Sequence, residues 1–535
     1  MQNTPAVTSK PYDAVIVGGG HNGLIAACYL AMAGRSVLIL EKNEAVGGAT
    51  FSKKAFPGID ARVSIYSYLI SLLPQKILAD LGIRLEIRRR AVASYTPVRK
   101  NGGVTGLLMR NDSEAATRQS FIDLTGGEGD YAGFLKLQSN IEIFAQKVWP
   151  TLLSPLTAKA ELRRQFQTAE ETRIWNSIIE EPISALIEAH LSDDTVRGAV
   201  FTDAKIGVPT YAADPSLLQN RTFIYHTIGQ GTGEWRVPVG GMGALVDALL
   251  EKAMAYGVSV LTSAEVFRVD HGLPVSDVHY RQKGKESAVR AKAVLFNTAS
   301  NIANQCLPGV YAEEQFAGSV YKINMVLKRL PALRDPRVSA RDAFTGTFHV
   351  EEGYRQMEQS YQNSQHARLE DVASLQGLPG EIYCHSLTDP SILSKDLQQS
   401  GYHTLTLFGV DVPYHWFEQD NERAKAAITE NYLRSINAYI QEDIRDCLAV
   451  DANGDLCIEA KSPLDLEQSL GLPKGNIFHG NLTWPFAERD DEIGTWGVET
   501  NFENVLICGS SAKRGGAVSG IPGHNAAMKL LGRSG

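Results

Sequence analysis

The feature that most restricts how this chain can fold is a short apolar segment that leads directly into a glycine-rich turn. Residues 14–17 read Ala-Val-Ile-Val, and Gly18, Gly20 and Gly23 follow with the spacing G-x-G-x-x-G before an apolar helical segment. In such a unit the first glycine permits the tight turn, the second lets the backbone approach a pyrophosphate, and the third allows close packing of helix and strand. The N–H groups at the helix N-terminus favour an anion. The segment therefore predicts a dinucleotide-binding site.

A second apolar strand is predicted at residues 36–40, and Glu41 ends it. Glu41 follows Gly23 by 18 residues (41 − 23), close to the roughly 20 expected for an acid that accepts hydrogen bonds from the adenosine ribose. This motif alone does not distinguish NAD from FAD. Gly47 and Gly48 stand where some flavoproteins carry a second glycine pair; an ordinary loop is the alternative interpretation, because glycine is common in turns.

The C-terminal part repeats this arrangement. An apolar strand predicted at 504–508 is followed by a glycine-rich turn at 509–523 and a helix at 524–531. Two such turns in one nucleotide domain suit a ligand larger than NAD. No second G-x-G-x-x-G lies between a strand and a helix, since residues 229–233 lack the spacing, so a separate NAD(P)H-binding domain is not expected.

The overall composition excludes several classes of protein. The chain has 535 residues, with 52 basic and 60 acidic side chains and a net charge of −8, which argues against a nucleic-acid partner. Its six cysteines form no C-x-x-C pair, which excludes the dithiol chemistry of disulfide reductases, gives no zinc-ligand spacing and fits a reducing compartment. We therefore predict no metal site. The N-terminal residues lack the pattern of a targeting signal, so a cytoplasmic location is expected.

Two segments could lie either inside the protein or at its surface. An apolar stripe within residues 68–81 is expected to pack into the core, with peripheral docking on a membrane as the alternative. No apolar run reaches the roughly 20 residues needed to span a bilayer. The tight basic run Arg88, Arg89 and Arg90 is expected at the solvated surface, with contact to an anionic lipid or a substrate as the alternative.

The remaining pattern alternates between helical and strand-rich regions. Residues 61–234 are mainly helical in pattern, whereas 311–470 alternate between apolar and polar residues, as in a half-buried antiparallel sheet. Between them, a glycine turn at 240–243 precedes a predicted helix at 244–256. Further strands are predicted at 258–261, 265–269 and 291–298.

The chain resembles the flavin amine oxidase and phytoene desaturase superfamily. It is more closely similar to the phytoene-dehydrogenase-like branch that contains pyridine nucleotide-disulfide oxidoreductase domain-containing protein 2. The resemblance spans nearly the whole chain, and it is carried by residues 12–23, 41–48, 56–58, 68–82, 240–245, 475–480 and 508–527.

The resemblance implies an α/β fold in which a Rossmann-like FAD-binding domain of the glutathione-reductase type is interleaved with an α+β substrate domain. The FAD-binding domain would comprise residues 1–60, 235–310 and 471–535. The substrate domain would comprise the helix-rich segment 61–234 and the antiparallel sheet of 311–470.

The resemblance also implies which residues contact FAD. The AMP end would lie at the first glycine turn, the diphosphate and ribityl near the second glycine pair, and the flavin against the C-terminal turn. A helix N-terminus at the flavin N1/O2 edge would stabilise negative charge on the reduced ring. The implied contacts are Gly18, Gly20, His21, Asn22, Gly23, Glu41, Lys42, Gly48, Ala49, Thr50, Val266, Gly509, Ser510, Gly516, Val518 and Ser519.

The implied activity is hydride transfer from a mostly apolar small molecule to the flavin at a C–C or C–N bond, with reoxidation by oxygen, a quinone or another acceptor. Two alternatives stay open: a redox-neutral flavin isomerase or saturase, and a non-catalytic FAD-bearing interaction protein. Lys513 and Arg514 replace the His-Pro pair usual in desaturases, which weakens the assignment to polyene desaturation. A homodimer is compatible with the sequence.

Three histidines are candidates for a direct role. His479 lies in a glycine-bounded segment expected near the flavin, and His385 lies on an alternating strand beside Tyr383. His524 is the third candidate and is expected to belong to the flavin helix. The alternative for each is a histidine that only completes a hydrogen-bond network.

Overall fold

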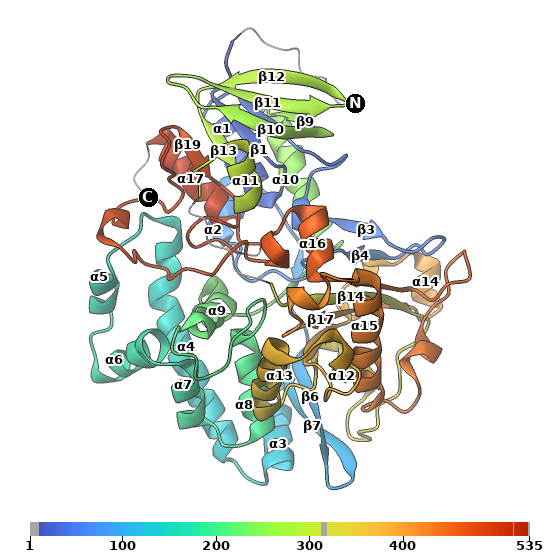
Figure 1. The fold of residues 1–535 in the computed structure, drawn as a ribbon. Coiled ribbons are helices and arrows are strands. Elements are labelled where there is room, and N and C mark those ends of the chain that lie inside the picture. Colours follow the sequence, from blue (N-terminus) through green and yellow to red (C-terminus); the bar gives the residue numbers. More distant parts are fainter. Residues whose placement is uncertain (1–9, 312–317, 517, 533–535) are drawn as a thin grey trace.

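Residues 10–311, 318–516 and 518–532 are described by this computed structural model, which contains two main sheets (Figure 1). The first is a five-stranded parallel sheet of order β19-β13-β1-β2-β9. Its strands come from three distant parts of the sequence, and each overlaps a strand that the apolar patterns predict. They are β1 (Ala14–Val17), β2 (Val37–Leu40), β9 (Ser259–Leu261), β13 (Val294–Phe296) and β19 (Val505–Ile507).

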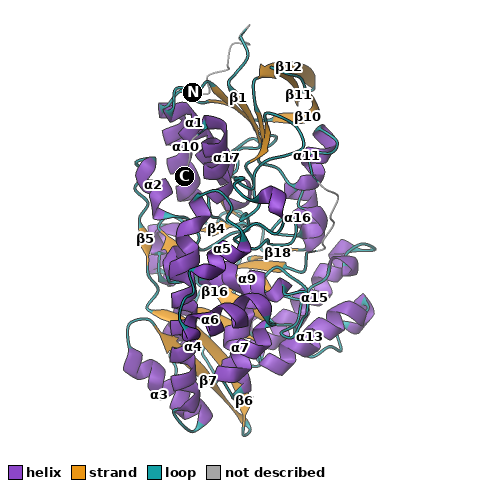
Figure 2. Cartoon of the chain, turned by 90° about the vertical axis from the view of Figure 1, so that its left-hand side faces the viewer, coloured by secondary structure: helices purple, strands orange, loops and turns teal. Residues whose placement is uncertain are grey.

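Side chains of the parallel sheet alternate between two covered faces, as the pleat of a strand requires. Ala14 and Ile16 of β1 pack in one core with three helices, whereas Val15 and Val17 pack in another with a three-stranded antiparallel sheet. Figure 2 shows these helices and this small sheet on opposite sides of β1. The elements are α1 (His21–Met32), α10 (Gly243–Ala255), α17 (Ile521–Leu531), β10 (Ala264–Asp270), β11 (Ser276–Gln282) and β12 (Lys285–Ala291).

The second main sheet has seven strands in the order β18-β14-β17-β16-β15-β6-β7 and is antiparallel except where β15 pairs with β6. Its strands are β6 (Val92–Lys100), β7 (Gly103–Arg110), β14 (Tyr321–Leu327), β15 (Thr347–Val350), β16 (Gly380–Tyr383), β17 (His403–Gly409) and β18 (Ile458–Lys461).

The hairpin β6–β7 corrects the sequence interpretation, which treats 61–234 as mainly helical. Its first strand pairs with β15, far away in the sequence, so long-range pairing decides its structure. The other strands of this sheet lie within 311–470, where alternating strands are expected; β18 is the exception, because it falls in a stretch whose pattern is that of loops. The division of the chain into five interleaved segments stays a prediction, which the origin of the strands in the two sheets supports.

Helices α3 to α9 form the layer beside this sheet (Figure 1). At its centre α4 (Gly129–Val148) buries Leu137, Phe144 and Val148 in one apolar core. The other helices of the layer are α3 (Glu114–Thr125), α5 (Lys159–Arg164), α6 (Ala169–Trp175), α7 (Ile183–His190), α8 (Asp194–Phe201) and α9 (Leu218–Thr227). The remaining elements are α2 (Gln75–Asp80), α11 (Ser300–Cys306), α12 (Ala340–Thr345), α13 (Tyr354–His366), α14 (Lys395–Gln399), α15 (Asn421–Asn437), α16 (Pro463–Leu470), β3 (Ser52–Lys54), β4 (Arg62–Ser64), β5 (Ile87–Arg88) and β8 (Val237–Pro238).

The apolar stripe within residues 68–81 lies inside the protein. Its leucine and isoleucine side chains are all buried, so they are not available to a membrane in this conformation. Among the described residues, no helix combines the length and the apolar character that crossing a bilayer requires. The buried residues of the stripe are Leu69, Ile70, Leu72, Leu73, Ile77, Leu78 and Leu81.

Candidate functional site

The carboxyl ends of the parallel strands frame a cavity of about 270 Å³. Gly18 follows β1, Glu41 follows β2, Asn297 follows β13 and Ser510 lies shortly after β19; all four line this cavity, which we call the nucleotide groove. Ligands of open α/β sheets bind at this edge because the loops after the strands converge there.

The glycine turn is tightly packed against the loop after β13. Gly18 has φ 100°, and a Cβ atom at Gly23 would lie 2.6 Å from both Gly18 O and Asn297 Nδ2. Asn297 Nδ2 donates to Gly18 O (3.0 Å) and Gly20 O (3.3 Å), and so ties the two loops together. Gly23 is therefore required for close packing, as the sequence motif predicts.

Glu41 is buried and is held in place by backbone donors. Its Oε2 accepts from Gly19 N at 2.7 Å and its Oε1 accepts from Asn43 N at 2.8 Å. Each carboxylate oxygen can accept a further hydrogen bond, so Glu41 can still receive ribose hydroxyls. The carboxylate is thus preorganised at the rim of the groove.

The residues present fit a dinucleotide. Asn22 Oδ1 and Thr298 Oγ1 are buried polar atoms without a partner among the described residues, and both residues line the groove. Buried polar groups normally have a partner, so these atoms indicate that a polar ligand completes the site.

The structure separates the predicted FAD contacts into two groups. Those that line the nucleotide groove are Gly18, Gly20, His21, Asn22, Glu41, Lys42, Gly48, Ala49, Val266 and Ser510. Those outside its lining are Gly23, Thr50, Gly509, Gly516, Val518 and Ser519. Val518 lines the neighbouring cavity, and Thr50 and Ser519 are buried.

Sequence reasoning missed part of the groove. Asn43, Phe267, Asn297 and Thr298 also line it. The polar Asn-Thr pair at the end of the strand predicted at 291–298 was the available signal, because loops after parallel strands converge on the ligand. The strand itself is shorter than predicted, since Ala291 ends β12 and only residues 294–296 form β13.

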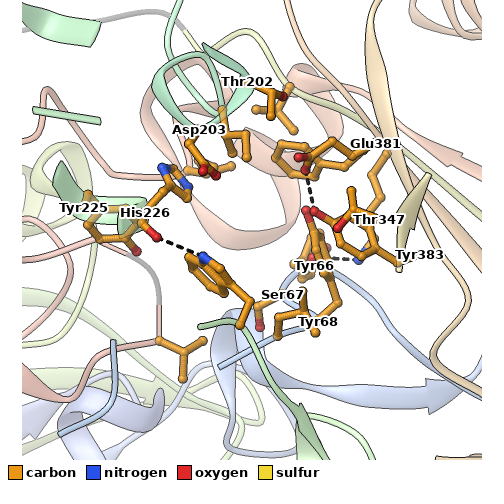
Figure 3. A pocket seen from close by; sticks show the side chains of 18 of the residues that line it. Tyr66, Ser67, Tyr68, Thr202, Asp203, Tyr225, His226, Thr347, Glu381 and Tyr383 are labelled. Atoms are coloured by element: carbon orange, nitrogen blue, oxygen red, sulfur yellow. Dashed lines mark hydrogen bonds between the residues drawn. The ribbon is translucent and has the colours of Figure 1, made fainter. Parts of the chain in front are cut away.

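A second cavity of about 300 Å³ adjoins the groove, and we call it the substrate cavity (Figure 3). The two share His21, Ala49, Leu470, Leu472, His479 and Ser510 in their linings, so they lie directly side by side. Much of the wall is aromatic, with Tyr66, Tyr68, Tyr225, Trp235, Phe408 and Phe478.

Charged side chains also line the substrate cavity. Arg90 donates to Thr347 Oγ1 at 3.0 Å, and the Tyr383 hydroxyl donates to Glu381. Burial raises the pKa of Asp203 to about 8 and that of Glu381 to about 7. Arg90 belongs to the basic run expected at the surface, but it is only 9% exposed. The surface interpretation is therefore wrong for Arg90, and its position inside the substrate cavity favours the substrate-contact alternative.

His479 lies where the two cavities meet, since it lines both. It adopts a left-handed backbone conformation (φ 66°), and its Nδ1 lies 3.1 Å from Ser511 Oγ. Burial lowers the pKa of its imidazole to about 4, so the ring is neutral at physiological pH. This placement keeps His479 as the leading candidate for a direct role.

The other two histidines lie elsewhere. His385 lines neither of the two large cavities; it stacks on Tyr383 with 5.8 Å between ring centres, and burial lowers its pKa to about 3. His524 lies in α17, where its ring packs edge-on against Tyr29. His385 follows β16 in a short 3-10 turn, whereas the sequence analysis expects it on the strand. It lines neither cavity, so its direct role stays a prediction that this position does not favour.

Comparison with known proteins places the chain in a family. A profile described as NAD(P)-binding Rossmann-like domain matches residues 16–73. The uncharacterized protein Rv0897c of Mycobacterium tuberculosis is 42% identical over 98% of this chain and 97% of its own length. Pyridine nucleotide-disulfide oxidoreductase domain-containing protein 2 of Mus musculus is 28% identical over 97% of this chain and 93% of its own.

The chain belongs to the flavin amine oxidase and phytoene desaturase superfamily. The predicted superfamily and fold class are thereby confirmed. Wild-type putrescine oxidase has a similar fold, with a TM-score of 0.58 at 17% identity over 98% of this chain and 99% of that one. At that identity the similarity concerns the fold alone.

Proposed function

We propose that this member of the family is an FAD-dependent oxidoreductase that oxidises a small molecule held in the substrate cavity, at a C–C or C–N bond. The observation that carries the proposal is that the two cavities share His479, Ser510 and Ala49 in their linings, from which we infer that the cavities become continuous around a bound cofactor. When bound, FAD supplies a ring that accepts a hydride, and oxygen, a quinone or another acceptor would reoxidise it.

The residues of the nucleotide groove would hold the cofactor by its polar parts. Gly18 and Gly20 would allow the backbone to approach the diphosphate, and the N-terminus of α1, which begins at His21, would face it. Glu41 would receive the ribose hydroxyls, and Val266 would contact the adenine. The turn around Val518 and Ser519 would lie at the flavin.

The residues of the substrate cavity would bind and orient the molecule to be oxidised. The aromatic wall excludes water and suits an apolar body, which supports the lipophilic substrate that the sequence predicts. Arg90, Asp203 and Glu381 would bind at least one polar group of the same molecule. We therefore expect a substrate with an apolar part and a hydrogen-bonding part.

His479 would position the reacting atoms at the junction of the two cavities. Because its imidazole is neutral, it can donate one hydrogen bond and accept another without adding charge. No step in the proposal requires His479 to be an essential base, since hydride transfer proceeds to the flavin.

We expect the enzyme to act in the cytoplasm, and we further predict contact with a membrane surface and assembly into a homodimer.

Anaerobic reduction of the bound flavin tests the proposal. The FAD-loaded protein is incubated without oxygen with panels of amines and of apolar molecules that carry a polar group, and the flavin absorbance is followed. We expect a substrate to bleach the flavin and admission of an acceptor to restore it. Turnover without net bleaching would instead support the isomerase or saturase alternative. A flavin that no compound or extract fraction reduces would support the non-catalytic alternative.

A further inference from the structure

One wall of the substrate cavity carries a cluster of three buried side chains, His349, Glu352 and Glu381. They are 3%, 2% and 3% exposed, and each offers one ligand atom within 4.8 Å of the others. His349 Nδ1 lies 3.6 Å from Glu352 Oε2. The imidazole and the two carboxylates are therefore close enough to converge on one ion after small side-chain movements.

The fold brings these residues together from two neighbouring strands and the turn that follows one of them. His349 on β15 and Glu381 on β16 are direct cross-strand partners. In a continuous strand Glu352, three residues after His349, would point to the opposite face. Glu351 instead adopts a left-handed conformation (φ 55°), which breaks the alternation and lets Glu352 approach His349.

The position of Glu352 is fixed from outside the cluster. Helix α8 packs closely on its backbone, because a Cβ atom at Gly198 would lie 2.0 Å from Glu352 O. On the other side, Thr96 Oγ1 lies 2.8 Å from His349 Nδ1 and orients the imidazole ring. A ligating histidine usually makes such a hydrogen bond through its other ring nitrogen, so Nε2 would be the atom that binds an ion.

The Glu352 carboxylate lacks partners of its own. Neither of its oxygens has a hydrogen-bond partner of good geometry among the described residues. Burial raises the pKa of Glu352, and the Thr202 hydroxyl is the one neighbour that lowers this pKa by weak hydrogen bonding. The nearby cations are engaged by other groups: Arg90 donates to Thr347, Lys322 donates to the Ser64 and Tyr66 carbonyls, and Lys205 pairs with Asp411. A buried carboxylate in such surroundings is unfavourable unless a cation or a proton neutralises it.

We propose that His349, Glu352 and Glu381 bind one divalent transition-metal ion at the wall of the substrate cavity. One imidazole and two carboxylates without a thiolate form a donor set for Zn²⁺, Mn²⁺ or Fe²⁺. This proposal departs from the sequence analysis, which predicts no metal site. Glu381 lies 32 residues after His349 (381 − 349) on another strand, so the cluster cannot be recognised from a local motif.

The ion would be open toward the cavity. His349 and Glu381 line the substrate cavity, whereas Glu352 does not. A site with three protein ligands leaves a coordination position for water or an oxygen atom of a bound molecule. This use of the ion rests on the proposed function, because it assumes a substrate in the cavity; binding of the ion itself does not.

The test uses the full-length, FAD-loaded protein. Metal content is measured by inductively coupled plasma mass spectrometry on the purified protein. Zn²⁺ is then titrated into chelator-treated protein against a chromogenic competitor. We expect one Zn²⁺ per chain, with affinity lowered by about tenfold or more in both His349→Gln and Glu352→Gln. Glu370→Gln removes a carboxyl group at an exposed position outside the cavity and is expected to bind Zn²⁺ as the wild type does.

Two results would overturn the metal site. The first is a wild-type protein that holds no stoichiometric Zn²⁺, Mn²⁺ or Fe²⁺ even after reconstitution. The second is a Glu352→Gln variant that binds Zn²⁺ as well as the wild type, which would indicate that a proton neutralises Glu352. The wild-type titration is decisive even if a variant does not fold. FAD content, read from the absorbance of the same samples, separates failure of the metal site from failure of the proposed function.

Discussion

The nucleotide groove and the substrate cavity meet at His479, but they are built in different ways. The groove is formed mainly by backbone at the ends of parallel strands, with glycines where a side chain would collide. The substrate cavity is formed by side chains from strands and helices far apart in the sequence, including Arg90, Asp203 and Glu381. A backbone site can serve one cofactor throughout a family, whereas a side-chain site can change its ligand by substitution.

The largest expected effect is in the groove, where a side chain at Gly23 would collide with backbone. Gly23→Val is expected to destabilise the protein by about 1–3 kcal/mol or more and to abolish FAD binding, because Gly18 O and Asn297 cannot both move away. FAD content per chain and the thermal unfolding midpoint measure this. Gly127→Ala is the control, since nothing lies within 4 Å of the added Cβ. Full FAD content in Gly23→Val would contradict the packing role.

The second substitution should affect the substrate cavity without affecting the nucleotide groove. Arg90→Met removes the cavity's guanidinium, and loss of a charged hydrogen bond to the substrate is expected to lower kcat/KM by about 10–100-fold while FAD content stays normal. The rate of flavin reduction by a substrate found in the anaerobic screen measures this effect. Arg89→Met is the matched control, because Arg89 is exposed and pairs with Glu234. Loss of FAD from a folded Arg90→Met protein would break the distinction between groove and cavity.

A third substitution should weaken cofactor binding and leave the substrate cavity unchanged, which is the reverse of the effect expected for Arg90→Met. Glu41→Ala is expected to weaken FAD binding by about tenfold, since it removes the acceptor for the ribose hydroxyls, and to leave the cavity unchanged. The dissociation constant of FAD, from titration of the apoprotein, checks this. Glu44→Ala, at an exposed position three residues away, should have no effect. Equal affinities in the two variants would remove Glu41 from the cofactor site.

The smallest expected effect concerns the junction and depends on pH. Burial lowers the pKa of His479 from 6.5 to about 4, so the unfolded chain binds its proton more readily than the folded protein does. The contribution of His479 to stability is therefore present above pH 6.5 and is lost as the pH falls toward 4. When the pH is lowered between these limits, the free energy of unfolding should fall by about 1–2 kcal/mol more in the wild type than in His479→Gln. This figure is already discounted for the partial exposure of the ring.

Urea denaturation of both proteins at pH 7.5 and pH 4.5 measures this difference in the free energy of unfolding. The contributions of the other histidines cancel because both proteins contain them. Parallel pH profiles for the wild type and His479→Gln would mean that the imidazole is not buried in its neutral form.

The same contrast explains how much could be predicted from the sequence. The strands of the parallel sheet, the glycine turn and Glu41 follow from patterns within about 30 consecutive residues, which is the length of a βαβ unit. The hairpin β6–β7 could not be predicted in this way, because its partner β15 lies far along the chain. Asn297 has a local signal, a polar residue after an apolar strand, but its bonds to Gly18 and Gly20 depend on the strand order.

The substrate cavity was less accessible to sequence reasoning. Arg90 stands in a run that resembles a solvated surface, and only the pairing of β6 with β15 places it beside Thr347. His349 and Glu381 meet because of the antiparallel register between β15 and β16. His479 was found because glycines bound its segment, whereas His385 was chosen on local pattern and lines neither of the two cavities.

The continuity of the two cavities is tested most directly by a crystal structure of the protein loaded with FAD. We expect the adenosine to lie beside Glu41 and Val266 and the flavin ring to lie beside His479 and Val518, with one face open to the substrate cavity. A flavin ring that lies away from His479, or whose faces are both closed off from that cavity, would contradict the account.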